Sequence, residues 1–120
     1  MAKKSDKDRD NLAAALDKIP QIFGDQAAIG MRLHELILSA APELKPRLWY
    51  GMPGYAKSRT QPVLVFIRRD DYLTFGITEK AKIVLAPGAT DQLIPSSWFM
   101  RELDEATEAR IAEIVRVAVG

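Results

Sequence analysis

The chain has 120 residues, of which 48% are hydrophobic and 28% charged, and its net charge is +1. Basic and acidic side chains nearly cancel, so there is no overall positive field to hold a polyanion, and no nucleic-acid partner is predicted. The absence of cysteine and the single histidine exclude disulfides, thiol catalysis and metal sites built on thiolates or clustered imidazoles.

The length suits a single domain spanning residues 1–120, with residues 1–5 expected to be disordered. The N-terminus is charged, and no apolar run approaches the roughly 18 residues that a membrane-spanning helix needs. We therefore predict a cytoplasmic protein with no membrane partner.

Two helices are predicted first. Ser5 and Asp8 resemble a weak capping box, and apolar residues then recur at helical spacing until Pro20, where the pattern predicts that the first helix ends. Asp25 is a suitable N-cap for a second helix that ends at Pro42. The apolar stripe of this second helix consists of Ile29, Leu33, Leu36, Ile37 and Ala40.

Strands follow. Residues 47–50 form a short extended segment, and residues 63–69 and 72–77 alternate as two strands of a hairpin with Asp70 and Asp71 as its loop. That loop would place Phe66 opposite Phe75 on one face of the sheet. Both faces would be largely apolar, so helices should cover one face and helices, a loop layer or a second subunit the other.

The last third of the chain closes the fold. Residues 79–85 suit either a helix or a strand, residues 86–91 suit a loop, and residues 98–103 suit a further strand. Asp104 is a good N-cap for a final helix. The predicted class is α+β: an antiparallel sheet of three to five strands packed with two N-terminal helices and a C-terminal helix.

The most distinctive segment is "LWYGMPGYAK", residues 48–57. Its "MPGY" suits a type II turn over residues 52–55, with glycine at the position that needs a positive φ. Aromatic rings around such a turn can line a ligand pocket, or they can simply fill the edge of the core. The candidate ligand-binding residues are Trp49, Tyr50, Met52, Tyr55, Lys57, Phe66, Phe75 and Trp98.

No catalytic or metal site emerges from the sequence. His34 is expected at the flank of the second helix, with no nucleophile nominated beside it. The carboxylates of the first helix and of the hairpin loop are interleaved with basic residues and show no calcium-loop spacing. Phosphate loops, dinucleotide fingerprints and nucleophile elbows are absent, and no cofactor is predicted.

The motifs resemble those of a known family. "SAAPELKPRLWYGMPGYA", preceded by "LDKIP" and followed by "LTFGI" and "IPSSWFMREL", resembles the YdhG-like family, a domain of unknown function, from about Leu16 to Val117. The resemblance implies a compact α+β domain without an assigned reaction, and some relatives are called frataxin-like iron chaperones. This chain has Pro46 and Asp70-Asp71-Tyr72 where that branch tends to carry an acidic residue and a histidine.

Three functional hypotheses follow. The first is non-catalytic binding of a small ligand or a protein through the aromatic turn, with self-association as a homodimer the favoured partner event because the hairpin is apolar on both faces. The second, implied by the resemblance, is iron delivery on carboxylates. The third is an unrecognised enzyme, for which the sequence names no nucleophile.

Overall fold

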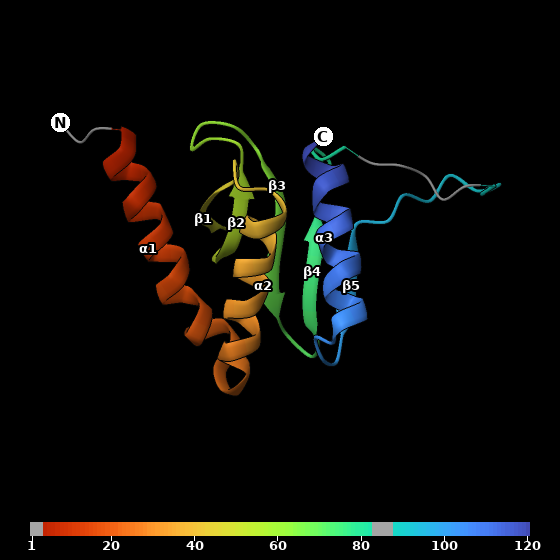
Figure 1. Cartoon of the computed structure of the whole chain (residues 1–120), viewed down its shortest axis with the longest axis horizontal. Coiled ribbons are helices and arrows are strands. Elements are labelled where there is room, and N and C mark those ends of the chain that lie inside the picture. The colour runs from red at the N-terminus through yellow and green to blue at the C-terminus, as the bar shows by residue number, and fades with distance from the viewer. Residues whose placement is uncertain (1–3, 83–87) are drawn as a thin grey trace.

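The computed structural model describes residues 4–82 and 88–120 and has the predicted α+β class. Five antiparallel strands form one sheet in the order β1-β2-β3-β4-β5, and the helices pack against one of its faces (Figure 1). The elements are α1 (Lys4–Phe23), the short 3₁₀ helix η1 (Gly24–Gln26), α2 (Ala27–Ala40), β1 (Lys45–Trp49), β2 (Met52–Ala56), β3 (Val63–Arg69), β4 (Leu73–Ile77), β5 (Ser97–Met100) and α3 (Glu105–Val119).

Helix α1 does not end at Pro20, as the sequence predicted, but continues to Phe23. Proline lacks the N–H that would bond to the preceding turn, yet Pro20 lies on the exposed side of the helix. The final turn is held by packing, because Ile19 and Phe23 on either side of Pro20 in the sequence are both completely buried. Tertiary contact therefore outweighs the local preference to stop.

The connection between α1 and α2 also differs from the prediction. Asp25 does not cap α2, which starts at Ala27 without a side-chain cap. The carboxylate of Asp25 instead accepts a hydrogen bond from Arg69 at 2.7 Å. Arg69 also donates to the carbonyl of Phe23 at the end of α1. One strand arginine thus fastens the corner where the two helices meet.

The aromatic turn lies three residues earlier than predicted. Tyr50 and Gly51, with φ of 50° and 77°, connect β1 to β2, and Trp49 pairs with Met52 across the turn. Two consecutive positive φ values are typical of the type I′ turn, whose twist matches that of a two-residue hairpin. Gly54 is therefore not a turn residue but part of β2, where it pairs with both neighbouring strands.

Replacing Gly51 with alanine should lower the free energy of unfolding by about 1–2 kcal/mol, because an L-residue pays that cost in the left-handed region. No atom lies within 4 Å of the new Cβ, so the effect comes from the backbone alone. Gly88 has a φ of 75° and equally open space but lies outside the paired strands, where the backbone can change its φ without breaking a strand pair. Gly88→Ala is therefore the matched control and should cost less. Urea unfolding of the two variants checks this, and equal losses would contradict it.

The register of the β3–β4 hairpin is shifted by one residue from the prediction. The loop has three residues, 70–72, because Arg69 pairs with Leu73, and the next pairs include Ile67 with Phe75 and Phe66 with Gly76. A shift of one residue moves a side chain to the other face of a sheet. Phe66 and Phe75 therefore lie on opposite faces rather than facing each other.

The helical face of the sheet holds the core. Val65, Ile67 and Phe75 are fully buried there, beneath the apolar stripes of the three α-helices. In the described part of the chain no helix covers the other face (Figure 1), and cover by a second subunit stays a prediction. We call this second surface the open face.

The C-terminal part follows the prediction in outline. Strand β5 spans Ser97–Met100, somewhat earlier than predicted, and α3 begins after Asp104, whose carboxylate accepts from the N–H of Thr107 at 2.8 Å. That bond lowers the pKa of the Asp104 carboxyl. Residues 79–82 form neither a helix nor a strand. The remainder of the predicted segment 79–85 and the first part of the predicted loop 86–91 lie outside the described residues, and so do residues 1–3.

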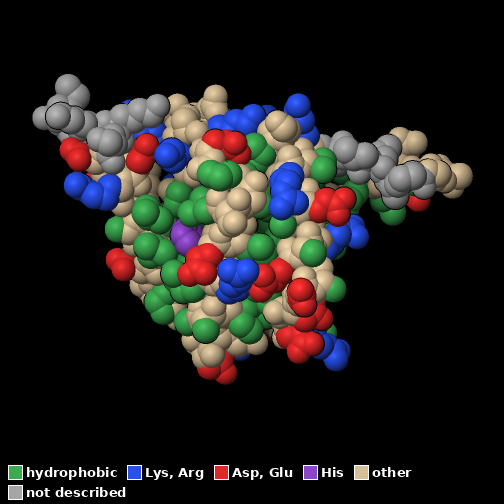
Figure 2. Space-filling view, in the orientation of Figure 1, with side chains coloured by type: hydrophobic (Ala, Val, Ile, Leu, Met, Phe, Trp, Pro, Cys, Tyr) green, Lys and Arg blue, Asp and Glu red, His purple; other side chains and the backbone are tan. Residues whose placement is uncertain are grey.

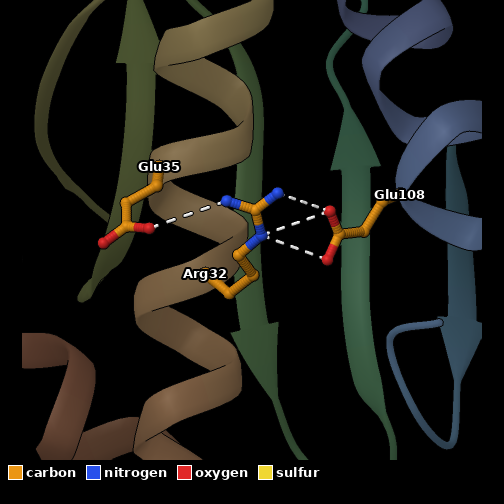
Figure 3. A network of polar contacts seen from close by, with 3 residues as sticks. All are labelled: Arg32, Glu35 and Glu108. Atoms are coloured by element: carbon orange, nitrogen blue, oxygen red, sulfur yellow. Dashed lines mark hydrogen bonds and ion pairs between the residues drawn. The ribbon is translucent and has the colours of Figure 1, made fainter. Parts of the chain in front are cut away.

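An ion pair joins α2 to α3 on the helical surface (Figure 3). Arg32 donates to both carboxylate oxygens of Glu108, with the shortest distance of 2.6 Å from Nη2 to Oε1, and its Nη1 lies 3.7 Å from Glu35. Pairing with Arg32 lowers the pKa of Glu108 and raises that of the guanidinium. Exposed pairs of this kind orient elements more than they stabilise them.

Candidate functional site

The open face gathers five of the nine aromatic residues of the chain. Two are exposed at opposite edges of the sheet: Tyr50 is 84% exposed at the turn after the edge strand β1, and Phe99 is 66% exposed on the edge strand β5. Trp49 and Phe66 lie half-buried between them, and Tyr72 is partly exposed beside Phe99. We call these five side chains the aromatic platform: Trp49, Tyr50, Phe66, Tyr72 and Phe99.

The rings of the platform form two groups. Trp49 lies 5.2 Å from Phe66 and 4.8 Å from Tyr50, measured between ring centroids, and Tyr72 stacks on Phe99 at 5.6 Å with an interplanar angle of 20°. The first group spans β1 to β3, and the second lies over β4 and β5. The platform therefore crosses the whole width of the sheet.

Two glycines give these rings room. The tip of the Phe66 ring fills the space above Gly76, where a Cβ atom would overlap it. A Cβ on Gly54 would lie 2.8 Å from the Cβ of Trp49. Glycines in central strands weaken a sheet, so their presence is typical of places where another group must approach the backbone closely. Here the approaching group is the platform's own aromatic side chains.

The charged residues of the strands are all basic. The five strands carry four basic residues and no acidic one. Arg47 donates from Nη1 to the carbonyls of Ser58 and Arg59, and so holds the β2–β3 loop with its positive charge uncompensated by these partners. Arg68 lies 3.4 Å from Asp70. Of the strand cations, Lys45, Arg47 and Arg68 belong to the open face and Arg69 to the helical face.

The structure separates the residues that the sequence grouped. Trp49, Tyr50 and Phe66 come together on the platform, with Met52 paired to Trp49 and Lys57 exposed just after β2. Tyr55 and Phe75 have no exposed surface and belong to the core, and Trp98 stacks on Phe75 at 5.8 Å on the helical side. Tyr72, Phe99 and Arg47 were not among the candidates. The predicted strand 98–103 included Glu102, so the absence of acidic residues from the strands became visible only with the observed end of β5 at Met100.

Two clefts border the sheet away from the β1–β2 turn. One, of about 320 Å³, lies between β5 and α3 and is mostly apolar, with Trp98, Met100, Ile111 and Ile114 among its walls. The other, of about 360 Å³, lies at the end of the β3–β4 hairpin between Gln26, Arg69 and Arg101. Neither is lined by Trp49, Tyr50, Met52, Tyr55 or Lys57, so the predicted turn site is a surface rather than a wall of these clefts.

A polar pair lies inside the core beneath α2. The Nδ1 atom of His34 is 2.8 Å from the hydroxyl oxygen of Tyr55, and the two residues are 5% and 0% exposed. Burial lowers the pKa of His34 and raises that of Tyr55, so both side chains are neutral at pH 7. The histidine shows only as a small patch between surrounding hydrophobic side chains (Figure 2). It is buried rather than at a boundary, and the pair fixes α2 on β2.

Comparison with known proteins adds nothing to this geometry. No family model, curated protein or solved structure matches the chain. Within residues 4–82 and 88–120, no three histidine or carboxylate side chains gather as metal ligands would. Among the same residues, no helix has the length and apolar character to cross a bilayer.

Proposed function

We propose that the chain is a non-catalytic binding module that holds a small ligand or a protein partner on its open face. The aromatic platform is the observation that carries this proposal. Clustered exposed aromatic side chains mark interaction sites, whereas isolated apolar residues on a surface are ordinary. Membership of the YdhG-like family is part of the same proposal and depends on the sequence motifs alone.

The backbone at Tyr50 supports the same surface. A tyrosine with a φ of 50° occupies a conformation that costs an L-residue about 1–2 kcal/mol, at a turn where asparagine or glycine would be relaxed. Backbone strain at a residue that plays no part in core packing is typical of functional positions. The strained turn presents the most exposed aromatic ring of the platform.

The two tryptophans allow a direct test, since Trp49 lies on the open face and Trp98 lines the cleft beside α3. The Trp98→Phe variant reports on the platform through Trp49 fluorescence, and Trp49→Phe reports on the cleft through Trp98. Both are titrated with the same panel of mononucleotides, sugar phosphates, fatty acids, peptides and oligonucleotides. A saturable response from Trp49 alone is expected.

A response from Trp98 alone would move the binding site to the α3–β5 cleft and contradict the proposal. Silence from Trp49 across the whole panel would also count against it. Thermal unfolding of both variants provides the control, because each replaces an indole by a smaller ring and must keep the fold for the comparison to hold.

A further inference from the structure

We infer that the occupant of the open face is a single-stranded nucleic acid. This inference depends on the proposed function and names its partner. It departs from the expectation drawn from net charge, because a value near zero for the whole chain conceals an open face whose strand residues include three basic ones, Lys45, Arg47 and Arg68, and no acidic one. Local charge and exposed rings, rather than total charge, determine whether a strand of nucleotides can bind.

The aromatic platform provides stacking positions. Unpaired bases present flat π surfaces and stack on exposed aromatic side chains whatever their sequence. The Trp49–Phe66 group and the Tyr72–Phe99 group lie over different strands. Strands are spaced about 4.8 Å apart, so a sheet of five spans about 19 Å from β1 to β5. A platform of this width has room for more than one base, which favours an oligonucleotide over a mononucleotide.

Basic side chains lie where a phosphate backbone would run. Lys45, Arg47 and Arg68 come from the open face of β1 and β3. The β2–β3 loop, fastened by Arg47, adds the exposed Lys57 and Arg59 beyond the end of the strands where Lys45 lies, whereas Arg68 lies near the opposite end of β3. Asp70 beside Arg68 is the carboxylate that opposes them. Cations flanking stacking rings are the combination that single-stranded sites use.

A second copy of the chain fits the open face less well. Two copies related by a two-fold axis would bring the same patch together, and the arginines of both would meet a sheet surface whose strands hold no carboxylate. Arg68 has Asp70 beside it, but burial of Lys45 and Arg47 away from any carboxylate would oppose association. A polyanion supplies the missing charge, whereas the homodimer expected from the sequence does not.

Fluorescence anisotropy with a labelled oligothymidylate of about ten nucleotides, a length within the site sizes of single-strand binding folds, tests the inference at low salt. Phe66→Ala and Phe99→Ala should each weaken binding by about 5- to 100-fold, as loss of one stacked base predicts. Arg68→Gln should reduce the slope of log K against log salt by about one. Val117→Ala, on an exposed position of α3, is the control and should leave binding unchanged.

Gly76→Ala is the sharpest variant, because it keeps every aromatic residue but displaces the Phe66 ring from the space above Gly76. It should weaken binding like Phe66→Ala. Circular dichroism checks the fold of each variant. Phe99→Ala replaces a mostly exposed side chain, so it still tests the inference if substitutions at the more buried Phe66 or Gly76 unfold the chain.

Several outcomes would overturn the inference. They are absence of binding at low salt, equal affinity for duplex and single strand, and affinity unaffected by the ring variants. A dimer in light scattering that Phe99→Ala dissociates would assign the face to a second copy instead. If Trp49 responds to another ligand class while the oligonucleotide does not bind, the inference fails and the proposed function survives; if Trp49 responds to nothing, both fail.

Discussion

Replacing Phe23 with alanine is expected to lower the free energy of unfolding by about 3–5 kcal/mol, the range for truncating a buried phenylalanine. Phe23 is fully buried at the end of α1, and the backbone of α2 crosses it so closely that a Cβ on Gly30 would lie 2.7 Å from its Cγ. The closely packed backbone of α2 cannot fill the vacated space without moving, so a cavity remains. Urea unfolding at constant m-value measures the loss.

Gln21 provides the matched control, because it is exposed on the same turn of α1 and its side chain bonds only to the carbonyl of Asp17. Gln21→Ala should change stability by less than about 0.5 kcal/mol. A loss below about 1 kcal/mol for Phe23→Ala, well under the range for a buried ring, would show that the turn after Pro20 is not packed as described.

Replacing Tyr55 with phenylalanine is expected to cost about 1–3 kcal/mol, although the ring itself is kept. The change leaves Nδ1 of His34 without a partner inside the core, and a buried polar atom without a hydrogen bond carries that penalty. Adding His34→Leu removes the stranded atom. The double variant should therefore lose less than the sum of the single losses, and strict additivity would contradict the pairing.

The same pair gives stability a pH dependence of known sign. Burial lowers the folded-state pKa of His34 below its ordinary value of 6.5, so the unfolded chain takes up the proton first as pH falls. Stability from the neutral histidine is fully present above about pH 6.5 and decreases below it. The stabilities of wild type and His34→Leu should diverge as the pH falls below about 6.5, whereas parallel curves would show that His34 does not titrate in this way.

The fold class was predictable because the change from helical to alternating periodicity is strong in this chain. The errors arose where tertiary contacts decided between local alternatives. Pro20 favours a helix end, but burial of Phe23 carries α1 onward. Asp25 is a good cap, but Arg69, distant in sequence, engages it instead.

The candidate site was predicted in part for a related reason. Trp49 and Tyr50 were recognised as aromatic residues at a turn, but the turn residues were assigned to "MPGY" because proline and glycine are its usual members. The hairpin register depended on whether the loop has two residues or three, a difference that alternation alone does not fix. That single residue determines that Phe66 joins the platform while Phe75 enters the core.

The strand order has a consequence for how the chain acquires its shape during synthesis. Because each strand pairs with the one made just before it, no strand has to be threaded between two that are already joined. The sheet can grow from one side as the polypeptide leaves the ribosome, beginning with the tight hairpin at Tyr50 and Gly51. Strand β5 and α3 dock last, after the longest connection between neighbouring strands, so an intermediate lacking only these two would still contain the four strands already assembled.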